Sequence, residues 1–273
     1  MTDFDLSTFR SKVLDYYEAY GRHDMPWRIP EPDDSFDPYK IMVSELMLQQ
    51  TQVARVTPKF LAFIDQFPTV QQLAAASLGE VLTVWSGLGY NRRAKFLHQA
   101  AQTVVGDFQG IFPATVEDLI QLPGVGKNTA GAIMAYAFNR PVVFIETNIR
   151  TVYIHHFFHD QLDIPDAAIT ELVQQTIDRE NPRLFYWALM DYGAYLKQIV
   201  GNLNKLSKSY ATQSTFEGSA RQIRGKVIKL LAAHPCSATH LQAQISDDRL
   251  PLILTELLHE GLITRTAEGY QLG

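Results

Sequence analysis

One segment constrains the fold of this chain more than any other: Leu122-Pro-Gly-Val-Gly-Lys-Asn-Thr-Ala-Gly131. Its proline ends one helix, Gly124 and Gly126 permit a turn with positive φ, and Asn128 or Thr129 is expected to open the next helix. Such a turn exposes backbone N–H groups at the positive end of a helix, where they can hold a phosphate without reading any base. A plain helix–helix turn is the alternative, but this combination of residues favours a hairpin that grips phosphate.

Helical periodicity dominates the rest of the sequence. Apolar residues recur at three-to-four spacing in the stripe from Phe9 to Tyr20 and again from Ile41 to Gln49, which predicts a chain that is nearly all helix. With 273 residues, of which 46% are hydrophobic, the chain can bury a sizeable core in two or three compact units. No apolar run approaches the roughly 20 residues that cross a bilayer, so we expect a cytoplasmic protein with no membrane partner.

The last quarter of the chain is patterned differently. Residues 197–218 are polar without strong periodicity and read as a linker or wrapping segment. After them we expect a helix over 220–233, a second helix capped by Ser237, a third over 250–260, and a two-stranded ribbon over 263–272. This order resembles a small winged-helix domain, a fold that binds DNA or proteins with similar ease.

Charge and cysteine content narrow the chemistry. The formal charge of −5 is unusual for a nucleic-acid-binding protein, although basic residues cluster at 92–95 and at 221–229, where either a phosphate contact or a solvated helix face is possible. Cys236 is the only cysteine. A single thiol excludes an intramolecular disulfide and any site made of several thiolates within the chain.

Two further motifs agree with the hairpin: Ser44-Glu-Leu-Met-Leu-Gln-Gln-Thr-Gln52, and Trp85-Ser-Gly-Leu-Gly-Tyr90 followed by Arg92-Arg-Ala-Lys95. Together the three closely resemble the endonuclease III superfamily, and within it the adenine glycosylases that remove adenine opposite 8-oxoguanine. The resemblance runs from about Met25 to Gly193. It implies an all-α helix-hairpin-helix glycosylase fold, with two helical lobes and a DNA cleft between them, followed by the winged-helix-like domain. The expected divisions are 28–137 for the lobe with the hairpin, 1–27 with 138–217 for the other lobe, and 218–273 for the C-terminal domain.

The resemblance assigns two carboxylates to catalysis. Glu45 lies in an otherwise apolar helix, where desolvation would keep it protonated near neutral pH, and the matching glutamate of the family protonates the adenine ring. Glu146 stands where relatives carry an aspartate that caps a helix and stabilises the cationic sugar. It is one methylene longer, so Thr147 could take over the capping and a structural role for Glu146 stays open. Asn148 matches the asparagine of the family.

The resemblance also marks residues that contact DNA. Bifunctional relatives carry at position 128 a lysine that forms a Schiff base, which Asn128 cannot do, so we expect no lyase activity. The pocket for the base is assigned to Trp27, Arg28 and Trp187, and Trp187 departs from the usual Gln or Glu. The duplex wedge and the hairpin contribute Gln50, Thr51, Leu88, Tyr90, Gly124, Val125, Gly126, Lys127, Asn128 and Thr129.

Two family features are missing from the sequence. Relatives follow a motif like Asp191-Tyr-Gly-Ala194 with four cysteines that hold a [4Fe-4S] cluster, but Lys197 stands at the first of these positions and the other three cysteines are absent. We therefore expect no cluster and no other metal. Typical adenine glycosylases also end in a domain resembling Nudix hydrolases, for which residues 219–273 are too few.

These observations predict a monomeric, monofunctional glycosylase of base excision repair that acts on double-stranded DNA with a mismatch or an oxidised base. Adenine opposite 8-oxoguanine or guanine is the expected substrate. Two alternatives remain: an enzyme that removes uracil or thymine from mismatches, and a non-catalytic protein that binds DNA lesions.

Overall fold

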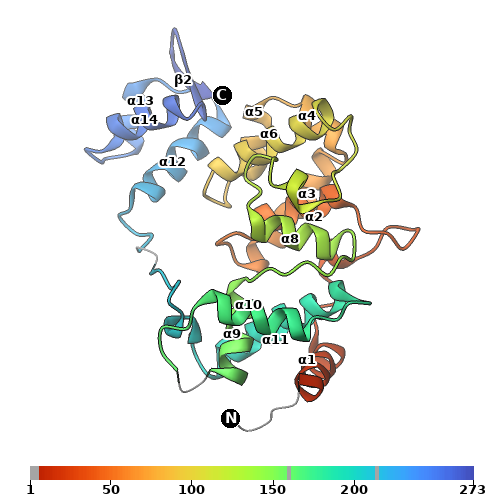
Figure 1. Cartoon of the computed structure of the whole chain (residues 1–273). Helices are drawn as coiled ribbons and strands as arrows, with labels where there is room; N and C mark the ends of the chain where they lie inside the picture. The colour runs from red at the N-terminus through yellow and green to blue at the C-terminus, as the bar shows by residue number, and fades with distance from the viewer. Residues whose placement is uncertain (1–5, 159–160, 213–214) are drawn as a thin grey trace. The chain divides into compact units, whose positions relative to one another are not determined.

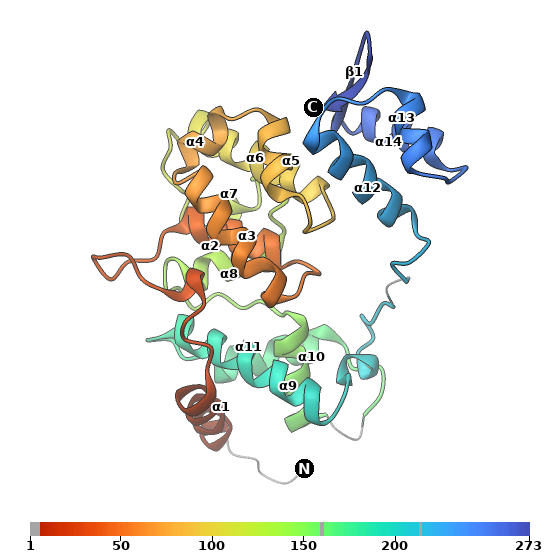
Figure 2. The same cartoon turned by 180° about the vertical axis from the view of Figure 1, so that it is seen from behind.

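The computed structural model describes residues 6–158, 161–212 and 215–273. These residues are mostly helical (Figures 1 and 2), which confirms the predicted all-α class. The α-helices are α1 (Leu6–Tyr20), α2 (Pro38–Leu48), α3 (Val53–Gln66), α4 (Val70–Ala75), α5 (Leu78–Trp85), α6 (Arg92–Gly106), α7 (Val116–Leu119), α8 (Lys127–Tyr136), α9 (Thr147–Phe157), α10 (Asp166–Thr176), α11 (Pro182–Ile199), α12 (Ala220–Ala233), α13 (Ala238–Gln244) and α14 (Leu250–His259). Two 3-10 helices, η1 (Pro26–Arg28) and η2 (Leu203–Leu206), and two strands, β1 (Ile263–Thr266) and β2 (Gly269–Leu272), complete the set. No helix within these ranges is long and apolar enough to span a bilayer.

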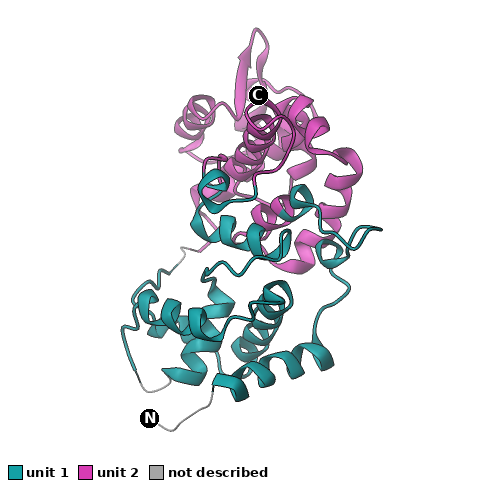
Figure 3. Ribbon diagram, turned by 45° about the vertical axis from the view of Figure 1, so that its right-hand side comes forward, with its two compact units in different colours: residues 1–41, 114–120, 125–212 teal, residues 42–113, 121–124, 213–273 magenta. Residues whose placement is uncertain are grey.

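The chain forms two compact units, and neither is one continuous stretch of sequence (Figure 3). Unit 1 comprises residues 1–41, 114–120 and 125–212, whereas unit 2 comprises residues 42–113, 121–124 and 213–273. The domain divisions expected from the sequence stay a prediction.

Unit 1 is built around the contact of α9 with α11. A Cβ atom added to Gly193 in α11 would lie 2.2 Å from the carbonyl oxygen of Asn148 in α9, so only glycine permits this close approach of the two backbones. The N-terminal helix α1 packs on α11 as well, and Phe9 lies with its ring centroid 5.2 Å from that of Tyr153. Both aromatic side chains are fully buried, so they form part of the core of this unit.

Unit 2 begins as a cluster of helices around the fully buried Trp85 at the end of α5. Helix α6 packs against both α4 and α5. The start of α5 carries a capping box, in which the Ser77 hydroxyl accepts from the Glu80 backbone N–H and the Glu80 carboxylate accepts from the Ser77 N–H. Local sequence therefore defines where α5 begins.

The C-terminal part of unit 2 follows the predicted order of elements. Ser237 caps α13 by accepting from the backbone N–H of His240 at 3.1 Å, as expected. Strands β1 and β2 pair antiparallel, with Ile263 opposite Leu272, and the backbone of Cys236 joins Tyr270 of β2. Helix α12 packs on α5 and β2, so this winged-helix-like part is folded onto its own unit.

Two local expectations from the sequence differ from the structure. Helix α8 begins at Lys127, with Gly126 at the N-cap, rather than at Asn128 or Thr129. The polar segment after Lys197 also contains η2, where buried Asn204 donates to the Thr151 hydroxyl of α9 at 2.8 Å. A single short helical turn leaves no periodicity in the sequence, so pattern analysis could not find it.

Candidate active site

Glu45 lies in α2, the helix that leads into the first of the predicted DNA-contacting loops. Its side chain is half-buried, while the neighbouring Ser44 and Leu46 and the more distant Met42 are almost completely buried. The apolar surroundings expected from the sequence are therefore present on this helix. Glu45 belongs to unit 2, whereas Glu146 belongs to unit 1.

Glu146 occupies the N-cap position of α9, but its side chain makes no capping hydrogen bond. Burial raises the pKa of its carboxyl above the ordinary value. Thr147 is the first residue of the helix rather than its cap, and its carbonyl oxygen accepts from the Thr151 hydroxyl at 2.9 Å. The carboxyl of Glu146 is therefore placed at the positive end of α9 without capping it.

Asn128 occupies the position where bifunctional relatives carry lysine. Its side-chain Nδ2 donates to the carbonyl oxygen of Ile145 at 2.9 Å. This bond joins the first turn of α8 to the extended run that ends at Glu146. Asn148 follows in the first turn of α9, where its backbone lies against Gly193.

The glycine-rich turn leads into the start of α8. Gly124 has a φ of +80°, and a Cβ atom there would lie 2.7 Å from Cβ of Phe96. Gly126, Lys127 and Asn128 are exposed, Thr129 is half-buried and Val125 is buried. No side chain caps the start of α8. An exposed helix N-terminus of this kind suits a phosphate.

Two loops of unit 2 carry the residues predicted to enter the duplex. Gln50 and Tyr90 both adopt positive φ, 56° and 48°, which is uncommon for residues with a side chain. Gln50 is exposed, Thr51 and Tyr90 are half-buried, and Leu88 is only 3% exposed. Leu88 would have to leave this buried position in order to enter a duplex.

Arg93 joins these two loops by hydrogen bonds, a structural role that was not predicted from the sequence. One guanidinium nitrogen donates to the carbonyl oxygens of Leu46 at 2.7 Å, Met47 at 2.9 Å and Gln49 at 2.5 Å. The other donates to the Thr51 hydroxyl at 3.1 Å and to loop carbonyls near Tyr90. Arg93 is 8% exposed, so its assignment to a basic surface cluster was wrong. Burial lowers the pKa of Arg93 to about 10, and the side chain is still a cation at neutral pH.

The residues predicted to form the base pocket lie in unit 1, and all three are buried. The Arg28 guanidinium lies 5.5 Å from the ring of Trp187. Trp187 stacks on Tyr136 at 6.0 Å and meets Phe36 edge-on at 5.4 Å. Trp27 belongs to η1, the turn that also carries Arg28. The structure thus brings Arg28 and Trp187 into direct contact among aromatic rings.

Asp191 anchors this aromatic region and was not predicted to have a role of its own. Its carboxylate accepts from Arg28 at 2.8 and 3.0 Å and from the backbone N–H of Arg22 at 2.7 Å. Burial alone would raise the pKa of Asp191, but the hydrogen bonds from Arg28 and Arg22 outweigh it and lower the pKa below its usual range. Within the described residues the Nε of Arg28 is buried without a partner.

The chain does not fit the iron-sulfur cluster of the family that it resembles. Such a cluster needs four cysteine thiolates, and the sequence holds only Cys236, which lies in the C-terminal part of unit 2. The segment after Lys197 instead packs on α9 through η2. Among the described residues there is also no group of three or more His, Cys, Asp or Glu that could hold a metal ion.

Comparison with known sequences identifies relatives along nearly the whole chain. Residues 43–176 match the family model described as HhH-GPD superfamily base excision DNA repair protein. Adenine DNA glycosylase of Mycolicibacterium smegmatis is 31% identical over 94% of this chain and 93% of its own length. The adenine DNA glycosylase of Buchnera aphidicola from Baizongia pistaciae is 34% identical over 81% of this chain, which spans 63% of that relative.

Solved structures agree on the fold. A thermostable thymine-DNA glycosylase superimposes on 69% of this chain and 86% of its own, with a TM-score of 0.59 and 25% identity. Endonuclease III trapped as a covalent intermediate with DNA covers 70% of this chain and 87% of its own, with a TM-score of 0.57 and 17% identity. The glycosylase fold expected from the motifs is thereby confirmed.

Proposed function

Because this chain belongs to the HhH-GPD superfamily of base excision DNA repair proteins, we infer that it is an adenine DNA glycosylase. It hydrolyses the N-glycosidic bond of adenine in double-stranded DNA, and we propose that the adenine is mispaired with 8-oxoguanine or guanine. The observation that carries the proposal is the match, over nearly its full length, to an adenine DNA glycosylase. We also propose that the enzyme is cytoplasmic, associated with the nucleoid if the source is bacterial, and that it acts as a monomer.

Glu45 is the proposed general acid. It protonates a ring nitrogen of the extruded adenine, so that the bond from N9 to C1′ of the sugar breaks with its electron pair on the base. The sugar thereby acquires oxocarbenium character, and water adds to C1′ with loss of a proton. The half-buried position of Glu45 beside the buried Ser44 and Leu46 supports this role, because it keeps the carboxyl accessible to a base from one side of an apolar helix.

Glu146 is proposed to stabilise the cationic sugar and to position the water, with Asn148 beside it at the start of α9. Its position supports the role, because its carboxyl makes no capping bond to the helix that it precedes. A negative charge on this carboxylate is therefore available to stabilise the cationic transition state. Asn128 has no amine, so the proposed reaction ends at the abasic site without cleavage of the strand.

The remaining predicted residues are proposed to hold the substrate. The hairpin from Gly124 to Thr129 binds the phosphate backbone, and Gln50, Thr51, Leu88 and Tyr90 fill the space that the extruded base leaves. Trp27, Arg28 and Trp187 form the proposed base pocket. The aromatic side chains around Trp187 support this assignment, because aromatic rings stack on extruded bases.

The test compares wild type with Glu45→Gln on duplexes that carry adenine opposite 8-oxoguanine, adenine opposite guanine, thymine opposite guanine and uracil opposite guanine. We expect wild type to release adenine, with strand scission only after alkali. Glu45→Gln should bind these duplexes as wild type does and lose at least about 100-fold in single-turnover rate.

The outcomes separate the alternatives. Release of thymine or uracil in place of adenine would reassign the enzyme to mismatches of those bases. Binding without release of any base by wild type would instead indicate a lesion-binding protein. Strand scission without alkali would contradict the monofunctional mechanism.

A further inference from the structure

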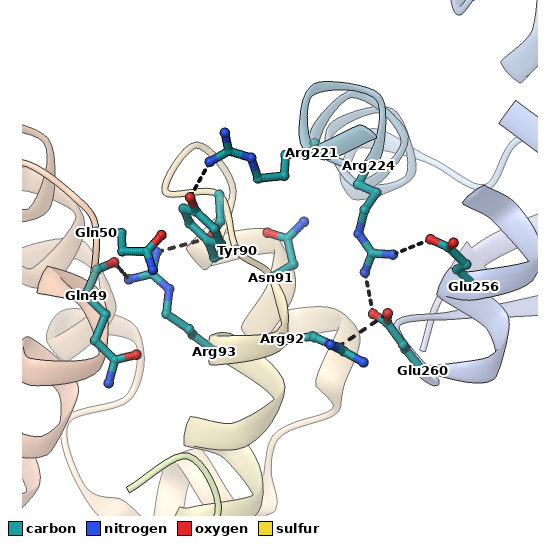
Figure 4. A pocket seen from close by; sticks show the side chains of 12 residues that line it. Gln49, Gln50, Tyr90, Asn91, Arg92, Arg93, Arg221, Arg224, Glu256 and Glu260 are labelled. Carbon is teal, nitrogen blue, oxygen red and sulfur yellow. Dashed lines mark hydrogen bonds and ion pairs between the residues drawn. The ribbon is translucent and has the colours of Figure 1, made fainter. Parts of the chain in front are cut away.

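Unit 2 contains a groove whose second wall is α12, in a part of the chain outside the segment that carries the glycosylase motifs. Two adjoining hollows of about 530 and 700 Å³ share Gln50, Tyr90 and Arg221 in their lining. One wall consists of the two loops predicted to enter the duplex, and the other is α12 (Figure 4). We call this feature the α12 groove.

The α12 groove has a positive lining. Seven of its residues are Arg or Lys and two are Glu: Arg55, Arg92, Arg93, Arg221, Arg224, Lys226, Lys229, Glu256 and Glu260. The two carboxylates are already engaged by cations. Arg224 pairs with Glu256 at 3.3 Å and also with Glu260, and Arg92 pairs with Glu260 at 3.3 Å. Positive charge therefore remains in excess, chiefly along α12, even though the whole chain carries −5.

The groove is connected directly to the predicted duplex wedge. Arg221 of α12 donates to the hydroxyl of Tyr90 (Figure 4). The Tyr90 ring lies between two guanidinium groups, with the carbon of Arg93 at 5.3 Å and that of Arg221 at 5.5 Å from its centroid. A duplex held by Tyr90 would thus pass along α12.

Among the three C-terminal helices, Lys and Arg lie within α12 alone. Helix α12 carries four cations, Arg221, Arg224, Lys226 and Lys229, and no carboxylate, whereas α13 and α14 contain neither Lys nor Arg. In a helix-turn-helix protein the second helix of the motif reads DNA, and here the later helices lack the cations that such a contact needs. The ribbon of β1 and β2, which corresponds to the wing, contributes only Arg265, whose guanidinium lies over Tyr270.

We propose that the α12 groove binds the sugar-phosphate backbone of the DNA strand opposite the extruded adenine. Exposed Lys226 and Lys229 provide the phosphate contacts, and Arg221 holds Tyr90 at the edge of the groove. The choice of strand rests on the proposed function, because Gln50 and Tyr90 are the residues expected beside the opposite base. Backbone contacts carry no sequence information, so this surface adds affinity equally for lesion and matched duplexes.

The test measures the affinity of the full chain for fluorescent duplexes as a function of salt. We expect Lys226→Ala/Lys229→Ala to weaken binding about tenfold at physiological salt and to reduce the slope of log K against log salt by about two. The loss should be equal for adenine opposite 8-oxoguanine and for a matched duplex. Lysine-to-alanine changes preserve helix propensity, and circular dichroism verifies that the variant is folded.

Two controls sharpen the result. Arg265→Ala removes the wing cation and should leave affinity and base release as in wild type. Neutral methylphosphonate linkages in the strand opposite the adenine should weaken wild type but have little further effect on the lysine variant. The same linkages in the adenine strand should weaken both proteins equally.

Wild-type affinity in the lysine variant would overturn the proposal. A loss of affinity confined to the 8-oxoguanine duplex would also overturn it. So would a loss of affinity from Arg265→Ala as large as that from the two lysine changes. Binding and base release are measured in separate assays, so the proposal of the α12 groove and the proposal of glycosylase activity can fail separately. A protein that releases no adenine but loses affinity in the lysine variant would retain the groove. An active enzyme with unchanged affinity in that variant would retain only the glycosylase assignment.

Discussion

At the scale of single residues, Glu146 differs from the aspartate of the resembling family, and its proposed role rests on its position at the start of α9. The resembling enzymes carry aspartate, which caps its helix, whereas Glu146 occupies the N-cap without a side-chain capping bond. Burial also raises the pKa of its carboxyl. A carboxylate that is desolvated and makes no cap costs stability when it is charged.

Glu146→Gln should therefore be more stable and less active. The raised pKa means that the carboxyl contributes stability fully below the unfolded value of 4.5 and loses it as pH rises through the folded pKa. The advantage of the variant in thermal unfolding should accordingly grow as pH rises above the unfolded value of 4.5. Its single-turnover base release should fall at least about 100-fold.

Glu146→Asp is the matched control for this prediction. The shorter side chain can cap α9 and restores the residue of the relatives, so we expect activity to be kept. A Glu146→Gln protein that releases base at the wild-type rate would show that the residue is structural.

At the scale of elements, a single buried cation joins the two loops that are predicted to contact DNA. Arg93 in α6 provides donors for the last carbonyls of α2 and for the loops on either side of the predicted wedge. Helix ends leave carbonyls without partners, and here a distant side chain satisfies several of them. The relative position of Gln50 and Tyr90 therefore depends on this one buried side chain.

Arg93→Ala should lower the free energy of unfolding by about 3 kcal/mol, because several buried carbonyls lose their donors together. Urea unfolding at neutral pH measures the loss. Its neighbour Arg92 is the control, with a side chain 65% exposed and one ion pair to Glu260. Arg92→Ala should change stability by less than about 1 kcal/mol, and equal losses in the two variants would contradict the assignment of Arg93.

The contrast between Arg92 and Arg93 shows what the sequence can predict. Amphipathic helices such as α12, the capping serine of α13 and the ribbon at the C-terminus were predicted because their signals are local. The two arginines have the same local signal, and only packing buries one of them. Asp191 could not be assigned for the same reason, since its partner Arg22 lies 169 positions away in the sequence.

At the scale of the whole molecule, the buried ion pairs of Asp191 tie the N-terminal segment to α11. Hydrogen bonds from Arg28 and Arg22 outweigh the effect of burial and lower the pKa of Asp191. A lowered pKa contributes stability that is present above the unfolded value of 3.8 and is lost as pH falls through the folded pKa. Part of the acid sensitivity of the protein should therefore arise from this one carboxylate.

Asp191→Asn should be less stable than wild type by about 3 kcal/mol at neutral pH, because it leaves two cations without their buried partner. The difference should shrink as pH falls below the unfolded value of 3.8 and through the lower folded pKa, where the wild-type carboxylate takes up its proton. Urea unfolding followed by tryptophan emission at several pH values measures both effects. A gap between the two proteins that stays constant with pH would contradict the role of Asp191.

The discontinuity of the two units also has a consequence for protein synthesis. Arg22 leaves the ribosome long before Asp191, which follows 169 residues later. At about 5 to 20 residues per second, this delay is roughly 8 to 34 seconds. Throughout that interval α1 has no α11 to pack against, and unit 2 waits until the last residues of the chain are made. Nascent chains of this protein are therefore expected to expose the apolar face of α1 until α11 has been synthesised.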